Sequence, residues 1–266
     1  MKRLNSLWFE GRLGYMERLS IASARAAGHP ITLFSYRPET LRGVPDGVEV
    51  RDAREVMNDE RRVRLFDGRY KALGSDFFRY ELFAKSLGYW IDLDVVILRP
   101  LQFDSDHVFG WEHETSINGA VLYLPPTSPI LRDLRAIPEK NWRPPFFGPR
   151  RTLLYYWRRA SRGTVLLEDL PWGSAGPALI TYLAHKYGML DLAQPREAFY
   201  PVPYDRAEDL FAEANIVDSL ITPETRAIHL WHSRLNRWYE RAPPSGSYMA
   251  RLCRKFGIDP LSPAGE

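Results

Sequence analysis

Apolar and polar positions follow two different periods in the first part of the chain. Leu4–Phe9 and Ile31–Phe34 are short apolar runs, as expected for buried strands. Between them, apolar residues recur at helical spacing until Gly28-His29-Pro30 ends the helix, at Tyr15, Leu19, Ala22 and Ala26. This strand-helix-strand opening predicts a mixed or parallel sheet with helices packed on its faces.

The same alternation of elements continues along the chain. A strand is expected at Val48–Val50, followed by a helix whose apolar stripe ends at Gly88. The apolar run Tyr89–Ile91 predicts a buried strand with Asp92-Leu93-Asp94 at its carboxyl end, and the apolar run Val95–Leu98 follows. Further strands are expected at 107–111, 117–124, 164–167 and 226–231, and further helices at 128–137, 176–187 and 248–256. We therefore expect a single α/β domain over residues 1–258 and a flexible tail at 259–266.

Composition excludes several classes of protein. With 266 residues, 45% hydrophobic and 26% charged, the chain is globular rather than disordered or collagen-like. Its single cysteine, Cys253, allows neither an internal disulfide nor a multi-cysteine metal site. The N-terminus lacks the pattern of a secretory signal, and no segment approaches the roughly 18 apolar residues of a membrane-spanning helix. We expect a cytoplasmic protein of bacterial type that contacts the inner membrane at most peripherally.

Charge is concentrated in one segment. The net charge of +3 is too small to indicate nucleic-acid binding. Residues 141–162, however, hold six arginines and no acid, interleaved with aromatic residues. Three interpretations stay open: a solvated basic helix, a flap that binds the acceptor of a reaction, or a surface for anionic lipids. A lipid-carried acceptor would suit the second and third, which we favour.

Asp92-Leu93-Asp94 is the most informative segment. In open α/β sheets ligands bind beyond the carboxyl ends of strands, and alternation places both carboxylates on one side of an extended strand. Two hard oxygen ligands suit Mg²⁺ or Mn²⁺. The alternative is a turn at the end of the strand with solvated acids. We interpret Asp104-Ser105-Asp106, which has the same Asp-x-Asp pattern in a polar loop, as such a turn.

Asp76 and Arg79 share one face of the helix that precedes this strand. Taken alone, they predict a surface ion pair worth roughly 0.2–0.5 kcal/mol, with Ser75 as a helix cap. Their place one helix before the acidic segment favours a second role. Asp76 would accept hydrogen bonds from sugar hydroxyls, and Arg79 would offer a planar donor fork to a carboxylate or phosphate.

These segments together resemble a known family. Ser75-Asp76-Phe77-Phe78-Arg79-Tyr80, followed by Gly88-Tyr89-Trp90-Ile91-Asp92-Leu93-Asp94-Val95, is similar to the signature of DXD-containing glycosyltransferases of family 32. That family includes globotriaosylceramide synthase and bacterial polysaccharide or lipooligosaccharide glycosyltransferases, and is more distantly similar to the clostridial glucosylating toxins. Asn118–Val121 and Gly173–Thr181 agree in order, so the resemblance spans roughly residues 4–232. Only Gly88 stands where family members commonly carry paired glycines.

The resemblance implies a GT-A fold, Rossmann-like, with a mixed and mostly parallel central sheet flanked by helices. It also implies a UDP-sugar donor, a glycan or glycolipid acceptor, Mn²⁺ or Mg²⁺, and transfer with retention. By carry-over, Asp94 would bind the metal, and Asp92 the ribose or a metal-bound water. Asp76 and Arg79 would face the donor sugar. Trp8 would lie near the uracil base, although a position in the core explains it equally well.

Other residues complete the expected site. His229, with His232 as the second candidate, comes from a strand resembling the one from which the family reaches back toward the metal; an ordinary core or surface histidine is the alternative. Glu112 follows an apolar strand and would act as a base or stabilise positive charge at the anomeric carbon, unless it is a surface acid. Asn118 and the helix start at Gly176-Pro177 are expected near the acceptor, the latter through free N–H groups, although ordinary capping also explains it.

Two other classes of function stay open. The segment Asp92-x-Asp94 also resembles the nucleophile motif of haloacid-dehalogenase-type phosphatases, in which Asp92 would attack phosphorus and Glu168-Asp169 would imitate the later acids. That motif usually lies near the start of a domain and is followed by glycine, whereas Val95 follows here. The second class is a basic module that binds membrane or nucleic acid through residues 141–162. We interpret the chain as a glycosyltransferase of polysaccharide biosynthesis that moves a hexose or N-acetylhexosamine and has no nucleic-acid partner.

Overall fold

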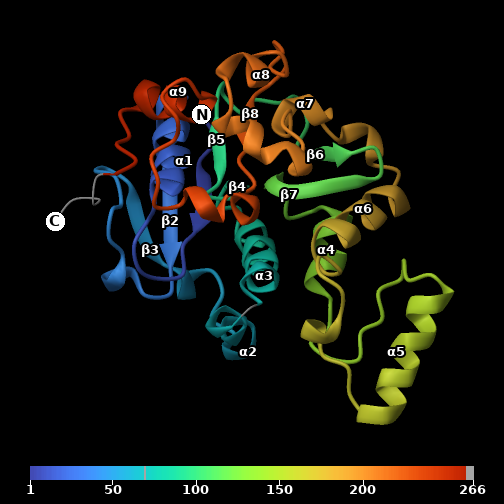
Figure 1. Ribbon diagram of the computed structural model, residues 1–266. Helices are drawn as coiled ribbons and strands as arrows, with labels where there is room; N and C mark the ends of the chain where they lie inside the picture. Colours follow the sequence, from blue (N-terminus) through green and yellow to red (C-terminus); the bar gives the residue numbers. More distant parts are fainter. Residues whose placement is uncertain (69, 262–266) are drawn as a thin grey trace.

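The computed structural model describes residues 1–68 and 70–261 of the chain (Figure 1). The strands are β1 (Leu4–Leu7), β2 (Ile31–Ser35), β3 (Glu49–Asp52), β4 (Tyr89–Ile91), β5 (Val95–Ile97), β6 (Val108–His113), β7 (Ser116–Tyr123) and β8 (Ala227–His229). The α-helices are α1 (Tyr15–Ala26), α2 (Glu60–Val63), α3 (Lys71–Ala84), α4 (Pro129–Arg135), α5 (Pro149–Arg162), α6 (Pro177–Lys186), α7 (Arg196–Phe199), α8 (Ala214–Asp218) and α9 (Tyr248–Phe256). Short 3-10 helices include η4 (Leu167–Asp169), η6 (Tyr204–Phe211) and η7 (His232–Arg234).

Six strands form one sheet in the order β3, β2, β1, β4, β7, β6. β1 pairs in parallel with β2 and β4, and β2 pairs in parallel with β3. β7 runs antiparallel to both β4 and β6. A separate antiparallel pair is formed by β5 and β8. The sheet is therefore mixed and mostly parallel, and the expected α/β fold class is confirmed.

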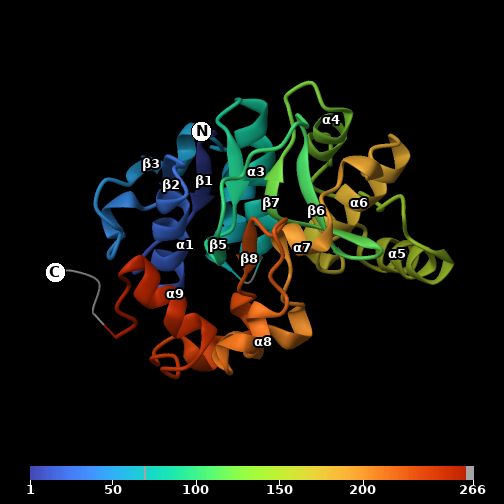
Figure 2. The same cartoon turned by 90° about the horizontal axis from the view of Figure 1, so that it is seen from above.

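The inner strands of the main sheet are buried on both faces, because their successive residues enter two different cores, whereas the edge strand β3 is partly exposed. In β4, Tyr89 and Ile91 belong to one hydrophobic core, whereas Trp90 belongs to the other. Leu33 and Phe34 of β2 divide in the same way. Helices α1 and α9 cover the first face, and α3, α4 and α6 cover the second (Figures 1 and 2). Burial on both sides explains why these strands read as apolar runs without alternation.

The predicted element boundaries agree closely with the structure at several places and fail at residues 164–167 and at residues 92–94, where a turn between β4 and β5 replaces the extended backbone expected for the two aspartates. α9 has the predicted bounds, and the side chain of Ser247 accepts a hydrogen bond from the N–H of Ala250 at its start. The strand expected at 164–167 is wrong. Leu166 makes a single bridge, and its N–H donates to the carboxylate of Asp169 at 3.0 Å, which turns the chain into η4. Of the tail expected at 259–266, residues 262–266 lie outside the described residues.

One glycine is sufficient for the turn before β4. Gly88 has a φ of +117°, and a Cβ there would lie 2.5 Å from the carbonyl oxygen of Arg3. The other left-handed residue of the turn is Ser86, with a φ of +57°. The missing second glycine therefore does not prevent the turn, because Ser86 takes the left-handed conformation in a position where a side chain fits.

Helix α5 extends away from the main body of the molecule (Figures 1 and 2). It forms most of the basic aromatic segment identified at residues 141–162. Every helix within residues 1–68 and 70–261 is too short or too polar to cross a lipid bilayer.

His29 is a buried histidine whose two ring nitrogens are both used. Its Nδ1 donates to the carbonyl of Lys2 at 2.8 Å, and its Nε2 accepts from the N–H of Leu101 at 2.9 Å. These partners fix the neutral tautomer with the proton on Nδ1. Burial lowers the pKa of His29 below its ordinary value, and this effect outweighs the hydrogen bond to Lys2, which acts to raise it.

We predict that His29→Leu lowers the free energy of unfolding by about 1–3 kcal/mol, because the buried N–H of Leu101 loses its acceptor. The unfolded chain takes up a proton at His29 near its ordinary pKa of about 6.5, whereas the folded protein does so only at lower pH. Wild-type stability should therefore fall as pH drops through this window, and His29→Leu should lack that component. Urea denaturation from neutral to mildly acidic pH measures both effects, with His185→Leu at an exposed histidine as control.

Candidate active site

The chain changes sheets at the acidic segment. β4 ends at Ile91 in the main sheet, and β5 begins at Val95 in the small sheet with β8. The N–H of Asp92 donates to the carbonyl of Ala120 at 2.8 Å, and the N–H of Val95 donates to the carbonyl of Asp92 at 3.1 Å. Asp92 and Asp94 therefore lie in a turn, and the extended geometry expected for them is wrong. Their proximity follows from the turn rather than from alternation along a strand.

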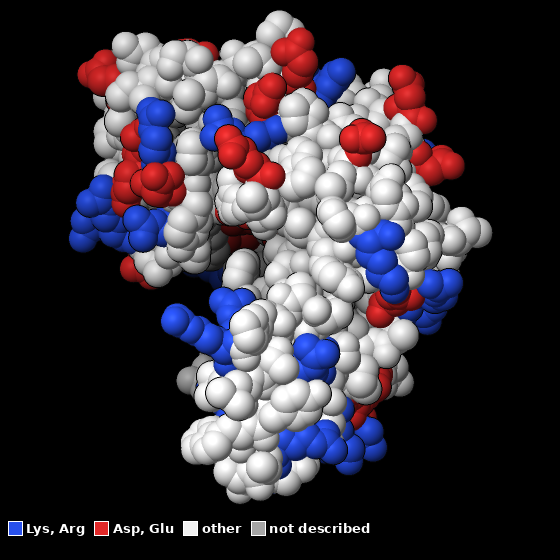
Figure 3. Space-filling view, turned by 90° about the vertical axis from the view of Figure 1, so that its right-hand side faces the viewer, with Lys and Arg blue, Asp and Glu red and all other residues white. Residues whose placement is uncertain are grey.

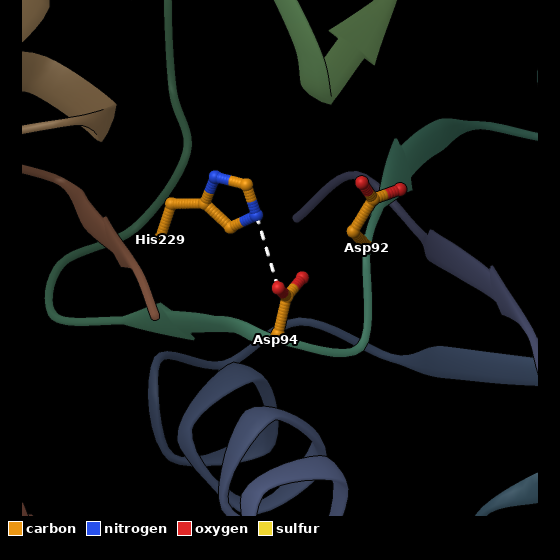
Figure 4. A group of neighbouring side chains, drawn as sticks. All are labelled: Asp92, Asp94 and His229. Atoms are coloured by element: carbon orange, nitrogen blue, oxygen red, sulfur yellow. Dashed lines mark ion pairs between the residues drawn. The ribbon is translucent and has the colours of Figure 1, made fainter. Parts of the chain in front are cut away.

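The antiparallel pairing of β5 with β8 brings His229 to this turn. His229 is opposite Val95 in the register, and the N–H of Leu230 donates to the carbonyl of Asp94 at 2.7 Å. One ligand atom from each of Asp92, Asp94 and His229 lies within 4.8 Å of the others (Figure 4). Residues separated by more than a hundred positions thus meet because two short strands pair.

Asp94 and His229 form an ion pair in which His229 is buried and Asp94 is half-buried. Nε2 of His229 lies 3.1 Å from Oδ2 of Asp94, and the backbone N–H of His232 donates to the same oxygen at 3.0 Å. Burial acts to raise the pKa of Asp94, but the charge of His229 and these hydrogen bonds outweigh it and lower the pKa to about 2. Burial likewise acts to lower the pKa of His229, and the charge of Asp94 outweighs it, so the pKa is raised.

The two candidate donor-binding residues of α3, Asp76 and Arg79, are buried side by side. Asp76 and Arg79 are 7% and 6% exposed, so the alternative of a surface ion pair is wrong. Nη2 of Arg79 lies 3.5 Å from Oδ1 of Asp76 and 3.6 Å from Oδ1 of Asp92. Its Nη1 donates to the carbonyl of Gly119 at 2.6 Å. Arg79 thus joins the two carboxylates to each other and to β7. Ser75 lies inside α3 and does not cap it.

Burial has opposite consequences for the two members of this pair. It raises the pKa of Asp76 to about 6, against the lowering effect of Arg79 and with a further increase from Asp92. Burial also acts to lower the pKa of Arg79, but the charges of Asp92 and Asp76 outweigh it, and the pKa is raised. Arg79 is therefore a fixed cation, whereas Asp76 takes up a proton under mildly acidic conditions.

Two glycines make room for this pair. A Cβ at Gly119 would lie 2.6 Å from Nη1 of Arg79, and a Cβ at Gly176 would lie 2.4 Å from Oδ2 of Asp76. The N–H groups of Gly176 and Ala178 both donate to the carbonyl of Gly173 at 3.1 Å. The expectation that Gly176-Pro177 offers free N–H groups is therefore wrong at these two positions. Pro177 occupies the first turn of α6, where it has no N–H to donate.

Trp90 is a site residue that the sequence reasoning missed. Its indole N–H donates to Oδ1 of Asp92 at 2.6 Å, and the guanidinium of Arg79 lies 4.9 Å from its ring centroid. The sequence contained a signal, since Trp90 lies only two positions before Asp92 in the same apolar segment. Its aromatic character suggested only a place in the core, where Trp90 indeed lies.

A pocket opens beside Asp76. Its volume is about 230 Å³, and it lies between the start of α3 and the segment that leads into α6. Asp76, Tyr70 and Leu73 line one side, and Glu168, Trp172 and Ser174 are among the residues on the other. Figure 3 shows a hollow on this side of the molecule with acidic side chains recessed in it. A ligand in the pocket would therefore contact a buried carboxylate.

The remaining candidates lie around this centre. The carboxylate of Glu112 accepts from the side-chain amide of Asn118 at 2.9 Å, and its charge contributes to the raised pKa of His229. The amide oxygen of Asn118 accepts from the N–H of Ala120 at 2.7 Å. Trp8 directly follows β1, which runs parallel to β4, so it emerges at the same edge of the sheet as Asp92. It is half-buried, and its indole N–H has no partner among the described residues.

His232 is placed differently from the expectation. Its ring stacks on Tyr239 at 4.5 Å between centroids, and its Nδ1 lies 3.9 Å from Oε1 of Glu17. Only its backbone N–H reaches Asp94. Glu17 is a buried acid that sequence reasoning missed, and the hydroxyl of Tyr239 donates to it at 2.9 Å. Nothing in the local sequence of α1 distinguishes this glutamate from a surface residue.

The residues of the cluster fit a divalent cation. Carboxylate oxygens suit Mg²⁺ and Mn²⁺, and imidazole is a common ligand of transition metals. Across residues 1–68 and 70–261, Asp92, Asp94 and His229 are the one set of three His, Cys, Asp or Glu side chains whose ligand atoms approach this closely. Glu168 and Asp169, the later acids of the phosphatase alternative, are not in it. Asp169 instead accepts from the N–H of Leu166 and pairs with Arg162.

We predict that Gly176→Ala destabilises the protein by about 1–3 kcal/mol more than Gly148→Ala, because the added methyl group displaces the buried carboxylate of Asp76. Both glycines are N-cap residues followed by proline, but Gly148 is extended (φ −67°, ψ 173°) and Gly176 is not (φ −111°, ψ −119°), so the double-mutant cycle below is needed to isolate the clash. A Cβ at Gly148 meets no described atom within 4 Å. Urea denaturation of both variants measures the difference.

A double-mutant cycle separates this clash from a general helix effect. Shortening the side chain in Asp76→Ala should remove most of the additional cost of Gly176→Ala. Equal losses for Gly176→Ala and Gly148→Ala, or the same loss with and without Asp76, would contradict the packing account.

Part of the chain is similar to a family of known proteins. Residues 168–258 match the profile of the alpha 1,4-glycosyltransferase conserved region, Gb3_synth. The matched stretch includes His229 but not Asp92 or Asp94. No curated protein matches the chain. Among solved structures, one titled PaToxG Glycosyltransferase aligns over 70% of this chain and 68% of its own, with 12% identity and a TM-score of 0.46, which carries no information on mechanism. The family match covers less than half of the chain, and in that stretch the chain is similar to a glycosyltransferase.

Proposed function

We propose that the protein transfers a hexose or N-acetylhexosamine from a UDP-sugar to a glycan or glycolipid acceptor, with the help of Mn²⁺ or Mg²⁺. The observation that carries this proposal is the meeting of Asp92, Asp94 and His229 beside the buried pair of Asp76 and Arg79. A diphosphate needs a cation, and a sugar needs hydrogen-bond acceptors. The two clusters supply ligands for the first and a carboxylate for the second.

In this proposal Asp94 and His229 hold the cation directly, and Asp92 contributes as a ligand or through a water molecule. A bound divalent ion supplies positive charge that stabilises the diphosphate as it leaves. His229 must lose its proton to act as a ligand, so cation binding competes with the protonation that Asp94 favours. The backbone N–H of His232 keeps the carboxylate of Asp94 oriented toward the cluster.

Asp76 is the proposed acceptor of hydrogen bonds from the donor sugar. It lines the pocket and lies in contact distance of Arg79, which holds its carboxylate in place. Arg79 has its donors directed at Asp76, Asp92 and the Gly119 carbonyl, so its proposed role is to position the two acids. Trp8, at the same edge of the sheet, is proposed to contact the uracil base.

The acceptor side of the proposal rests on Glu112 and Asn118. Their hydrogen bond fixes the carboxylate of Glu112 at the end of β6. There it would serve as a base or stabilise positive charge at the anomeric carbon. Retention of configuration is part of the proposal on the resemblance to family 32 alone. Proton NMR of the product anomer tests it, and an inverted product would overturn it.

We predict that UDP binds the wild-type protein in the presence of Mn²⁺ and binds at least about tenfold more weakly without it. Asp94→Asn should lose the dependence on Mn²⁺, because a direct ligand is removed while the shape of the side chain is kept. Isothermal titration calorimetry of UDP with and without Mn²⁺ measures both affinities.

The chain supplies its own control for this experiment. Asp104→Asn alters an exposed aspartate of the same Asp-x-Asp spelling, and it should bind UDP and Mn²⁺ like the wild type. Equal loss in Asp104→Asn would mean that the effect is one of charge or folding. Unchanged Mn²⁺-dependent binding in Asp94→Asn would contradict the metal assignment.

A further inference from the structure

Helix α5 presents its apolar side chains to solvent. Leu153 and Trp157 are four residues apart, so they are neighbours on one face, and they are 74% and 63% exposed. Leu154 and Tyr156 on either side of this face are also exposed. Tyr155 is the buried residue of the helix. A surface helix of a globular protein normally turns its apolar stripe inward, and α5 does the reverse.

At about 100° per residue, Arg150 lies on the exposed apolar face of α5, whereas Arg151 and Arg159 lie on sides of the helix away from it. Arg150 and Arg151 lie at the start of α5, Arg159 lies near its end, and all three side chains are exposed. Residues 141–162 contain no acid that would neutralise them. The lower part of the molecule in Figure 3 is correspondingly rich in basic side chains. The surface therefore combines large apolar groups with positive charge beside them.

The body of the protein holds α5 in this orientation. On the inner side, Arg158 donates to the carbonyl of Asp169 at 2.7 Å, and Arg162 pairs with the carboxylate of Asp169 at 3.4 Å. Before the helix, the ring of Phe146 packs against Tyr182 of α6. Asp169 belongs to the same segment, 167–175, that lines the pocket beside Asp76. The exposed helix is thus joined directly to one wall of the candidate site.

We propose that α5 docks the protein on an anionic lipid bilayer. Leucine and tryptophan side chains would enter the boundary between headgroups and acyl chains, Arg150 would contact lipid phosphates beside them, and the long side chains of Arg151 and Arg159 would reach toward the headgroups from the sides of the helix. Nucleic acid is bound by positively charged grooves and by aromatic rings on which bases stack. Exposed leucines do neither, so their presence on this face favours a bilayer over nucleic acid. The positive charge favours a bilayer over a second copy of this chain, because two such faces would repel each other. The proposal is independent of the donor and the metal proposed above.

Vesicle flotation tests the proposal with the intact chain. We expect the wild type to float with vesicles that contain phosphatidylglycerol and to stay in solution with phosphatidylcholine alone. The pair Leu153→Ser and Trp157→Ser, and separately the pair Arg150→Glu and Arg151→Glu, should each lower the partition coefficient by about tenfold or more. Because these side chains are exposed, the circular dichroism melting curve should not change.

Matched controls distinguish docking from general electrostatics. Arg241→Glu with Lys255→Glu makes the same change in net charge on exposed residues outside α5 and should leave partition unchanged within about twofold. Equal losses in both charge variants, equal binding to phosphatidylcholine alone, or no vesicle binding would overturn the proposal. It would also be overturned by a concentration-dependent dimer in sedimentation velocity that Leu153→Ser and Trp157→Ser abolish. The proposal would likewise be overturned if the wild-type protein bound an oligonucleotide but did not bind vesicles.

Discussion

Burial of the Arg79 guanidinium between two carboxylates constrains three elements of the fold at once. Arg79 comes from α3, Asp92 follows β4, and the carbonyl of Gly119 that accepts its hydrogen bond belongs to β7. A buried cation costs several kcal/mol unless its charge and donors are satisfied. The helix and both strands must therefore be in register before the arginine is stable. Glycine at positions 119 and 176 is needed because side chains there would occupy the space of Arg79 and Asp76.

The second constraint is the change of sheet after β4. The main sheet continues from β4 to β7, whereas the chain itself leaves through a turn and pairs with β8 as β5. This departure leaves Asp92 and Asp94 at the edge of the main sheet with their side chains accessible to a ligand. The pairing with β8 adds His229 from a remote part of the chain. A site for a charged ligand thus forms where the regular hydrogen bonding of the sheet is interrupted.

Helices α5 and α9 show that amphipathic patterning does not by itself fix which side of a helix is buried. α9 turns its apolar residues inward and packs on α1 in the first core. α5 is also amphipathic, but most of its large apolar residues point to solvent and only Tyr155 is buried. The difference arises from the neighbours. α9 has a complementary helix surface beside it, whereas α5 extends from the body and is held through arginine contacts to Asp169.

The sequence by itself determined the order of most elements, an α/β fold with a mixed or parallel sheet, and the segments that carry the candidate site. These predictions depended on local patterns: apolar runs for β2 and β4, helical spacing for α1, and proline at the start of α6. Through the resemblance to a family, the sequence also predicted Asp92, Asp94 and His229 as candidate metal ligands, and the structure places them close together. It failed at residues 164–167, where the carboxylate of Asp169 accepts from the backbone and replaces a strand with a turn.

Only the tertiary structure decided how these residues act on one another. The burial of Asp76 and Arg79, the indole of Trp90 on Asp92, and the place of His232 beside Glu17 and Tyr239 all depend on contacts between distant segments. The i, i+3 spacing of Asp76 and Arg79 places them on one face of the helix, but it does not show whether that face is turned to solvent or to the core. Burial and hydrogen bonding across elements set pKa values and side-chain orientation, and neither is a property of the local sequence.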